Sequence, residues 1–225
     1  MRAKIPWARV LAEGTAIVVS ILLAFGIQAG WERRQEGDDA SRALEALRQD
    51  FTANRDTLSL LVSDHTLWAD ELAWFYATPL EEHLASPRSD SIAERVLASF
   101  VLQITYDPTV GSLETLLRGG RIGVIQSAEL ENALWLWERQ LSDSQEEAQL
   151  LIGTVNTTIQ EFVRLGIFDP RLPEEPPPGA IEKLWRSDAL ASQASILELW
   201  RGSYVSELES LLRLTDSVLA LIDAR

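Results

Sequence analysis

The sequence predicts an all-α protein in which an N-terminal transmembrane helix continues into an elongated antiparallel bundle of three long helices plus two short helices. Three observations predict this fold. An uncharged apolar run lies near the N-terminus, heptad-like apolar patterns recur in three long stretches, and segments rich in proline or glycine separate these stretches. The 225 residues are enough for one domain and a membrane anchor.

Composition excludes several kinds of function. The chain has no cysteine, so it forms neither disulfides nor thiolate metal sites and has no cysteine nucleophile. Its net charge is −14, and almost all of the acidic excess follows residue 31, because residues 1–31 hold three basic residues and one acidic one. A surface this acidic repels nucleic acid, so we expect no nucleic-acid partner.

The run from Gly14 to Trp31 carries no charge and would cover roughly 27 Å as a helix, which suffices for the hydrocarbon core of a bilayer. Trp7 and Trp31 bracket it, as interfacial aromatic residues do. A cleavable signal peptide is the alternative, since residues 27–29 resemble a cleavage site, but the run is longer than a usual signal core. We therefore expect an uncleaved anchor, with the lipid bilayer as one partner.

The flanking charges favour a cytoplasmic N-terminus, because the basic residues Arg2, Lys4 and Arg9 precede the run. The bias is slight, since Arg33 and Arg34 follow it. The predicted organisation is a short cytoplasmic tail (1–13), a transmembrane helix (14–31) and an extracytoplasmic helical bundle (32–225).

Small or polar residues recur every four positions along one face of this predicted helix, with Glu13 beside them: Ala12, Ala16, Ser20, Ala24 and Gln28. Small residues at this spacing allow another helix to approach closely, and Gln28 could form a hydrogen bond across the contact. The alternative is that Glu13 and Gln28 only extend toward the membrane interfaces. The face predicts a homo-oligomer or a contact with another membrane protein.

Three long helices are predicted at about 36–77, 127–166 and 188–223, each with an apolar seam that alternates by three and four. The first seam comprises Leu44, Leu47, Phe51, Asn54, Leu58, Leu61, His65, Trp68, Leu72 and Phe75. The second comprises Leu130, Leu134, Trp137, Leu141, Ser144, Ala148, Leu151, Val155, Thr158, Phe162 and Leu165. The third comprises Leu190, Ala194, Leu197, Arg201, Tyr204, Leu208, Leu211, Thr215, Val218 and Ile222.

The first long helix has a second stripe, made of Ala46, Ala53, Leu60, Leu67 and Trp74, which predicts packing against more than one neighbour.

Two short helices are predicted between the first and second long ones, at about 91–103 and 108–118. Ser91 and Glu94 have the spacing of a capping box for the former, and Asp107 precedes Pro108 as a cap for the latter. Gly119 and Gly120 are expected to end the latter. Residues 78–90 and 169–179 are predicted breakers because of their prolines, and residues 121–125 are the only strand-like stretch.

Two stretches resemble a known family. Glu13 and Gly14 lead into the apolar run that ends at Gln28 and Trp31, and DPTVGSLETLLRGGRIGVIQSAEL follows at residues 107–130. They resemble an uncharacterised family of small bacterial single-pass inner-membrane proteins, over roughly the first two thirds of the chain. The family usually has an aromatic residue where Leu113 stands and one glycine where Gly119 and Gly120 stand. The resemblance implies a bacterial inner-membrane location but no activity.

Few residues suggest chemistry. His65 and His83 are the only histidines, and isolated core or surface positions explain them better than a shared metal. Arg118 and Arg121 flank the glycine pair and are a possible anion or partner contact, although a helix stop explains the same residues. We expect no catalytic, cofactor-binding or metal site.

Two functions remain. The first is a membrane-anchored structural or interaction protein that acts as a scaffold or accessory subunit, without catalytic activity of its own. The second is an extracytoplasmic ligand-sensing bundle, which would signal through a partner membrane protein because the predicted cytoplasmic tail is too short for an output domain.

Overall fold

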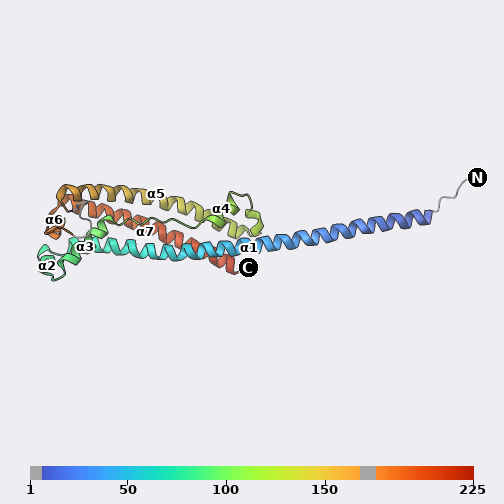
Figure 1. The fold of residues 1–225 in the computed structure, drawn as a ribbon, viewed down its shortest axis with the longest axis horizontal. Helices are drawn as coiled ribbons and strands as arrows, with labels where there is room; N and C mark the ends of the chain where they lie inside the picture. Colours follow the sequence, from blue (N-terminus) through green and yellow to red (C-terminus); the bar gives the residue numbers. More distant parts are fainter. Residues whose placement is uncertain (1–6, 168–175) are drawn as a thin grey trace, which may run out of the picture. The chain divides into compact units, whose positions relative to one another are not determined.

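The computed structural model describes the backbone of residues 7–167 and 176–225, and the side chains from residue 20 onward within these ranges, except that of Asp90. Figure 1 shows its helices. In chain order they are α1 (Trp7–Ala77), α2 (Leu80–Ala85), α3 (Ser89–Val101), α4 (Gly111–Leu117), the 3-10 helix η1 (Ile122–Ile125), α5 (Ala128–Leu165), α6 (Ala180–Arg186) and α7 (Asp188–Asp223). These described ranges contain no strand, so the predicted all-α class is confirmed.

The chain forms two compact units. One contains the residues up to Leu47 together with 112–127, and the other contains residues 48–111 together with 128–225. In the first unit, Arg121 pairs with Asp39 at 3.6 Å. Its large buried apolar side chains are those of Leu47, Leu113, Leu116 and Ile125.

The second unit is a bundle of α5, α7 and the part of α1 that follows Leu47. Trp137 of α5 donates a hydrogen bond to Thr215 of α7 at 2.8 Å, and Gln140 bonds to Glu207. A residue further along α5 thus contacts a residue earlier in α7, which makes the two helices antiparallel (Figure 1).

Ion pairs give the direction of α1. Arg48 pairs with Asp223 at 3.1 Å and Arg55 with Asp216 at 2.6 Å, so α1 also runs antiparallel to α7. It follows that α1 and α5 run parallel to each other. The predicted antiparallel arrangement is therefore wrong for this pair, because residues 78–127 carry the chain back before α5 begins.

The predicted seams form the core. All of their residues are buried except Leu44, Leu141 and Leu165, which are half-buried. Ring contacts join the elements, with Phe51 at 5.0 Å from Trp137 and Phe100 at 5.3 Å from Phe162. The heptad pattern therefore identified the buried faces of all three long helices correctly.

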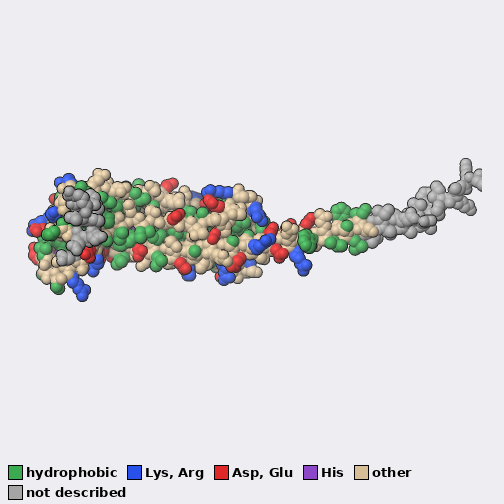
Figure 2. Space-filling model, in the orientation of Figure 1, with side chains coloured by type: hydrophobic (Ala, Val, Ile, Leu, Met, Phe, Trp, Pro, Cys, Tyr) green, Lys and Arg blue, Asp and Glu red, His purple; other side chains and the backbone are tan. Residues whose placement is uncertain are grey.

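The second stripe of α1 does not pack as predicted. Ala46, Ala53, Leu60 and Leu67 are exposed, and Trp74 is 41% exposed beside Arg95 of α3. The described part of the bundle has no further long helix that would cover this stripe. Figure 2 shows other apolar side chains on the surface of the bundle.

The connecting segments differ from their predicted boundaries. Helix α3 begins at Ser89 with Arg88 at its N-cap position, so Ser91 and Glu94 form no capping box. Helix α4 begins at Gly111 rather than at Pro108.

The predicted breaker at residues 78–90 contains the short helix α2, because a proline is tolerated at the start of a helix. Residues 121–125 contain a 3-10 turn instead of a strand. Gly120 has a φ of +66°, and α4 ends before it as predicted.

None of the helices, over the residues that are described, has a stretch long and apolar enough to cross a membrane. The predicted span lies within α1, and its residues 14–19 are outside the residues whose side chains are described.

Two adjacent leucines of α5 allow a direct test of the core. Leu151 is fully buried, whereas 46% of Leu150 is exposed. We expect Leu151→Ala to lower the free energy of unfolding by about 2–5 kcal/mol, because the substitution leaves a cavity. Leu150→Ala should change it by less than about 1 kcal/mol. Chemical denaturation of both variants measures the difference, and equal losses would contradict the assignment of the seam.

Candidate functional site

The predicted membrane-helix face is only partly described. The side chains of Ala12, Glu13 and Ala16 lie outside the described residues. Ser20, Ala24 and Gln28 are exposed on α1. Gln28 donates a hydrogen bond to Glu32 of the same helix at 2.9 Å. This bond does not prevent Gln28 from exchanging Glu32 for a group on a partner helix.

The turn around the glycine pair has the geometry of a helix stop. Arg118 pairs with Glu114 at 2.9 Å, and Arg121 pairs with Asp39. The backbone amides of Gly119 and Gly120 donate to carbonyls of α4. The groups that an anion would need at this turn are thus already used within the protein.

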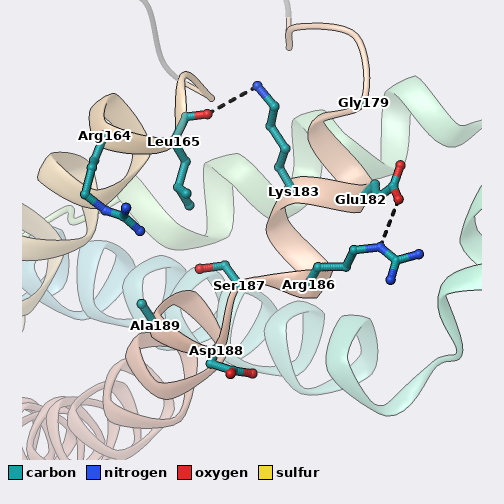
Figure 3. A pocket seen from close by; sticks show the side chains of 9 residues that line it. All are labelled: Arg164, Leu165, Gly179, Glu182, Lys183, Arg186, Ser187, Asp188 and Ala189. Atoms are coloured by element: carbon teal, nitrogen blue, oxygen red, sulfur yellow. Dashed lines mark hydrogen bonds and ion pairs between the residues drawn. The ribbon is translucent and has the colours of Figure 1, made fainter.

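A cleft of about 600 Å³ lies at one end of the bundle, where α5 ends and α6 meets α7 (Figure 3). Three of its charged side chains, those of Glu182, Lys183 and Arg186, have structural partners. Lys183 donates to the carbonyls of Leu165 and Gly166, both at 3.2 Å, and Arg186 pairs with Glu182 at 2.9 Å. A lysine that bonds to the last carbonyls of a helix stabilises the helix end, which explains the position of Lys183.

The most unusual feature of the bundle is an extended segment, residues 102–110, which we call the strap. It connects α3 to α4 and has no helical structure (Figure 1). Most of its side chains are exposed or half-buried, and Tyr106 alone is buried. An extended segment on a helical surface has no neighbouring strand to bond its peptide groups, so other groups must do so.

Buried polar side chains of α1 and α7 bond the backbone of the strap. Arg201 donates to the Leu102 carbonyl at 2.9 Å, and His65 donates to the Ile104 carbonyl at 2.8 Å. The Tyr106 amide donates to the Tyr204 hydroxyl at 2.9 Å.

Asn54 makes two bonds to the far end of the strap. It donates to the Thr109 carbonyl and accepts from the Thr109 amide, both at 2.8 Å. Asn54, His65, Arg201 and Tyr204 are all seam residues, so four polar residues within two apolar seams hold the strap.

The spacing of these residues matches the two backbone geometries. From Asn54 to His65 a helix rises roughly 16 Å. From Ile104 to Thr109 an extended chain covers roughly 16 Å in fewer than half as many residues. The strap can therefore reach both side chains without a bulge, and it runs antiparallel to α1.

The pKa of His65 is lowered in the folded protein, so its ring is neutral at pH 7. Burial is the largest cause and lowers this pKa. The bond to Ile104 and the charge of Asp64 raise it, and the charge of Arg201 lowers it. Because Nε2 donates to Ile104, Nδ1 carries no proton and is a buried acceptor without a hydrogen-bond partner among the described residues. The rings of Trp68 and Tyr204 lie 4.9 and 5.0 Å from its own.

Arg201 is a charged group in the core. Its side chain is fully buried, its guanidinium lies 5.6 Å from the Trp68 ring centre, and burial lowers its pKa to about 10, so it stays protonated at neutral pH. Its Nε and Nη1 atoms have no hydrogen-bond partner, and no carboxylate of the described residues pairs with it. Burying a charge without a counter-ion costs roughly several kcal/mol, so this side chain requires an explanation.

Two strap residues add to this set. The Gln103 side-chain oxygen and the Tyr106 hydroxyl are buried without partners in the described structure. Burial raises the pKa of Tyr106, so its hydroxyl keeps its proton and can donate. We call His65, Gln103, Tyr106 and Arg201 the strap cluster.

Within the described residues there is no group of three or more histidine, aspartate or glutamate side chains that could hold a metal ion. His83 bonds to the Phe75 carbonyl at 2.9 Å and stacks on the Phe75 ring, so its role is structural.

Comparisons with protein families, with characterised proteins and with solved structures find no match to this chain. The resemblance to bacterial inner-membrane proteins therefore stays a prediction.

The contact between Asn54 and Thr109 can be tested by truncation. We expect Asn54→Ala to lower the free energy of unfolding by about 2–4 kcal/mol, because the amide and the carbonyl of Thr109 both lose their partner. The exposed Asn156 of α5 is the matched control, and Asn156→Ala should cost less than about 0.5 kcal/mol. Indistinguishable denaturation curves for the two variants would show that Asn54 does not hold the strap.

His65 predicts a dependence of stability on pH. Its pKa is lower in the folded protein than its ordinary value of 6.5, so the unfolded chain takes up a proton first as the pH falls. This contribution is complete above pH 6.5 and is lost as the pH falls toward the folded pKa, by at most about 1.4 kcal/mol per pH unit. His65→Gln keeps a donor for Ile104 but does not titrate, so its loss of stability between pH 7.5 and 5.5 should be smaller. An equal slope in both proteins would contradict this prediction.

Proposed function

We propose that this protein is a membrane-anchored helical bundle that acts as a scaffold or accessory subunit through contacts with other membrane proteins. The observation that carries the proposal is the surface of α1 over residues 20–31. Large apolar side chains point outward there on every side of the helix: Ile21, Leu22, Leu23, Phe25, Ile27 and Trp31. Figure 2 shows this apolar stretch beside the residues that are not described.

The geometry of a helix explains why this surface favours a membrane. Ile21, Leu22 and Leu23 are consecutive and therefore point in directions roughly 100° apart. A helix that is apolar all round requires apolar surroundings on all sides, and within the described chain these side chains stay exposed. The uncharged sequence continues back to Gly14, which gives the length that a bilayer needs.

Topology and location follow from the same proposal. The basic residues before Gly14 favour a cytoplasmic N-terminus and an extracytoplasmic bundle, in a bacterial inner membrane.

Two features support a role in protein contacts. Ser20, Ala24 and Gln28 continue the small-residue face on which another helix can pack closely. A shallow groove of about 350 Å³ between α5 and α7 has Leu150, Ile196 and Trp200 in its lining, and the first two are exposed. The proposed partners are a second copy of this chain or another membrane protein, and an enzyme activity is not part of the proposal.

A second candidate function is ligand sensing by the extracytoplasmic bundle, with a partner membrane protein carrying the signal. The charge of Arg201, buried without a counter-ion in the described structure, favours this candidate.

The contact face of α1 can be tested by added bulk. Ser20→Leu with Ala24→Leu should leave the protein in the membrane fraction but reduce cross-linking in native membranes severalfold, because the face no longer permits close approach. Gly26→Leu is the matched control. It lies roughly 200° around the helix from Ala24, and an added Cβ would have no atom within 4 Å apart from the helix's own backbone.

Two results would overturn the proposal. One is wild-type protein in the soluble fraction, and the other is a double variant that cross-links as strongly as the Gly26→Leu control.

A further inference from the structure

We propose that the strap cluster is a binding site for a small monocarboxylate that also carries a neutral hydrogen-bond donor, such as a hydroxyl group. Arg201 would hold the carboxylate, and the strap would close over the ligand. The inference rests on the second candidate function and gives its ligand a chemical class.

The positive charge of Arg201 determines the charge of the ligand. A guanidinium has five N–H donors, and the three on Nε and Nη1 have no acceptor among the described residues. A carboxylate accepts such donors and neutralises the charge at the same time. Neutral His65 adds no second positive charge, so a monoanion fits the cluster better than a phosphate dianion.

The remaining cluster groups determine what else the ligand carries. Nδ1 of His65 and the side-chain oxygen of Gln103 are buried acceptors without partners in the described structure. A hydroxyl group next to the carboxylate would supply the missing donor without adding a positive charge. The Tyr106 hydroxyl also lacks a partner there and can donate to the carboxylate.

The burial of Arg201 determines the size of the ligand. Its side chain is fully buried, so the surface of a macromolecule does not reach it, whereas a small molecule does once the strap lifts. The strap is the element best suited to lift, because Tyr106 is its one buried side chain and the other anchors are hydrogen bonds to its backbone. Segments with few buried apolar contacts open at the lowest free energy.

The test uses the full chain in detergent, with glycolate as the probe, at constant ionic strength. Thermal unfolding and titration calorimetry should show saturable binding that raises the melting temperature as glycolate is added. Acetate should bind more weakly because it lacks the hydroxyl, and inorganic phosphate should bind more weakly than glycolate.

Arg201→Met removes the charge and should abolish the glycolate effect. Arg213→Met makes the same change at an exposed position of α7 and should retain it. Tyr106→Phe removes one oxygen and should raise the dissociation constant roughly tenfold, the value of one hydrogen bond. This variant decides the matter if Arg201→Met does not fold.

The proposal is overturned if glycolate shows no saturable binding, if Arg201→Met binds it as well as Arg213→Met does, or if phosphate binds more tightly than glycolate. Because the measurement is made in detergent, it is independent of the cross-linking test, and either can fail without the other.

Discussion

The hydrogen-bonding requirement of nine extended residues shapes this bundle more than any other interaction. The strap lies among helices, and the described residues form no strand that could bond its peptide groups. Buried peptide groups without partners are strongly destabilising. The protein meets this requirement with side chains from the seams of α1 and α7. Asn54, His65, Arg201 and Tyr204 occupy buried seam positions, where most other residues are apolar, and each bonds the strap backbone.

The strap also explains how α1 and α5 can run parallel to each other. A chain that leaves the end of α1 and starts α5 parallel to it must return along the bundle. An extended strap covers about twice the distance per residue that a helix covers, so a short segment makes the return possible. The strap thus takes the place of a further helix, and the second apolar stripe of α1 stays exposed in the described bundle.

The sequence predicts correctly those features that depend on local periodicity. The alternation by three and four identified the buried faces of α1, α5 and α7, because burial on a helix follows from the 3.6-residue repeat. It failed for Asp107 and Pro108, which have the local signature of a helix start but lie in the strap, where Asn54 bonds the nearby Thr109 backbone. That contact joins residues far apart in the chain, and no local pattern encodes it.

The strap cluster has no signature in the sequence, for a related reason. The heptad pattern places His65 and Arg201 at seam positions. An arginine at such a position usually pairs with an acid or extends to solvent. Only the fold shows that Arg201 is fully buried without a carboxylate partner in the described structure, and that His65 and Tyr106 also have unused polar atoms. The unusual polar residues of the core thus hold the strap and define the proposed site together.

Amide hydrogen exchange of the strap tests most directly whether side chains of α1 and α7 hold it. If the side chains of α1 and α7 hold the strap, the amides of Tyr106 and Thr109 exchange much more slowly than those of an unstructured peptide. Tyr204→Phe then removes the protection of Tyr106 and leaves that of Thr109, which bonds to Asn54. Exchange of both amides at the rate of an unstructured peptide in the wild-type protein would contradict the central role of the strap.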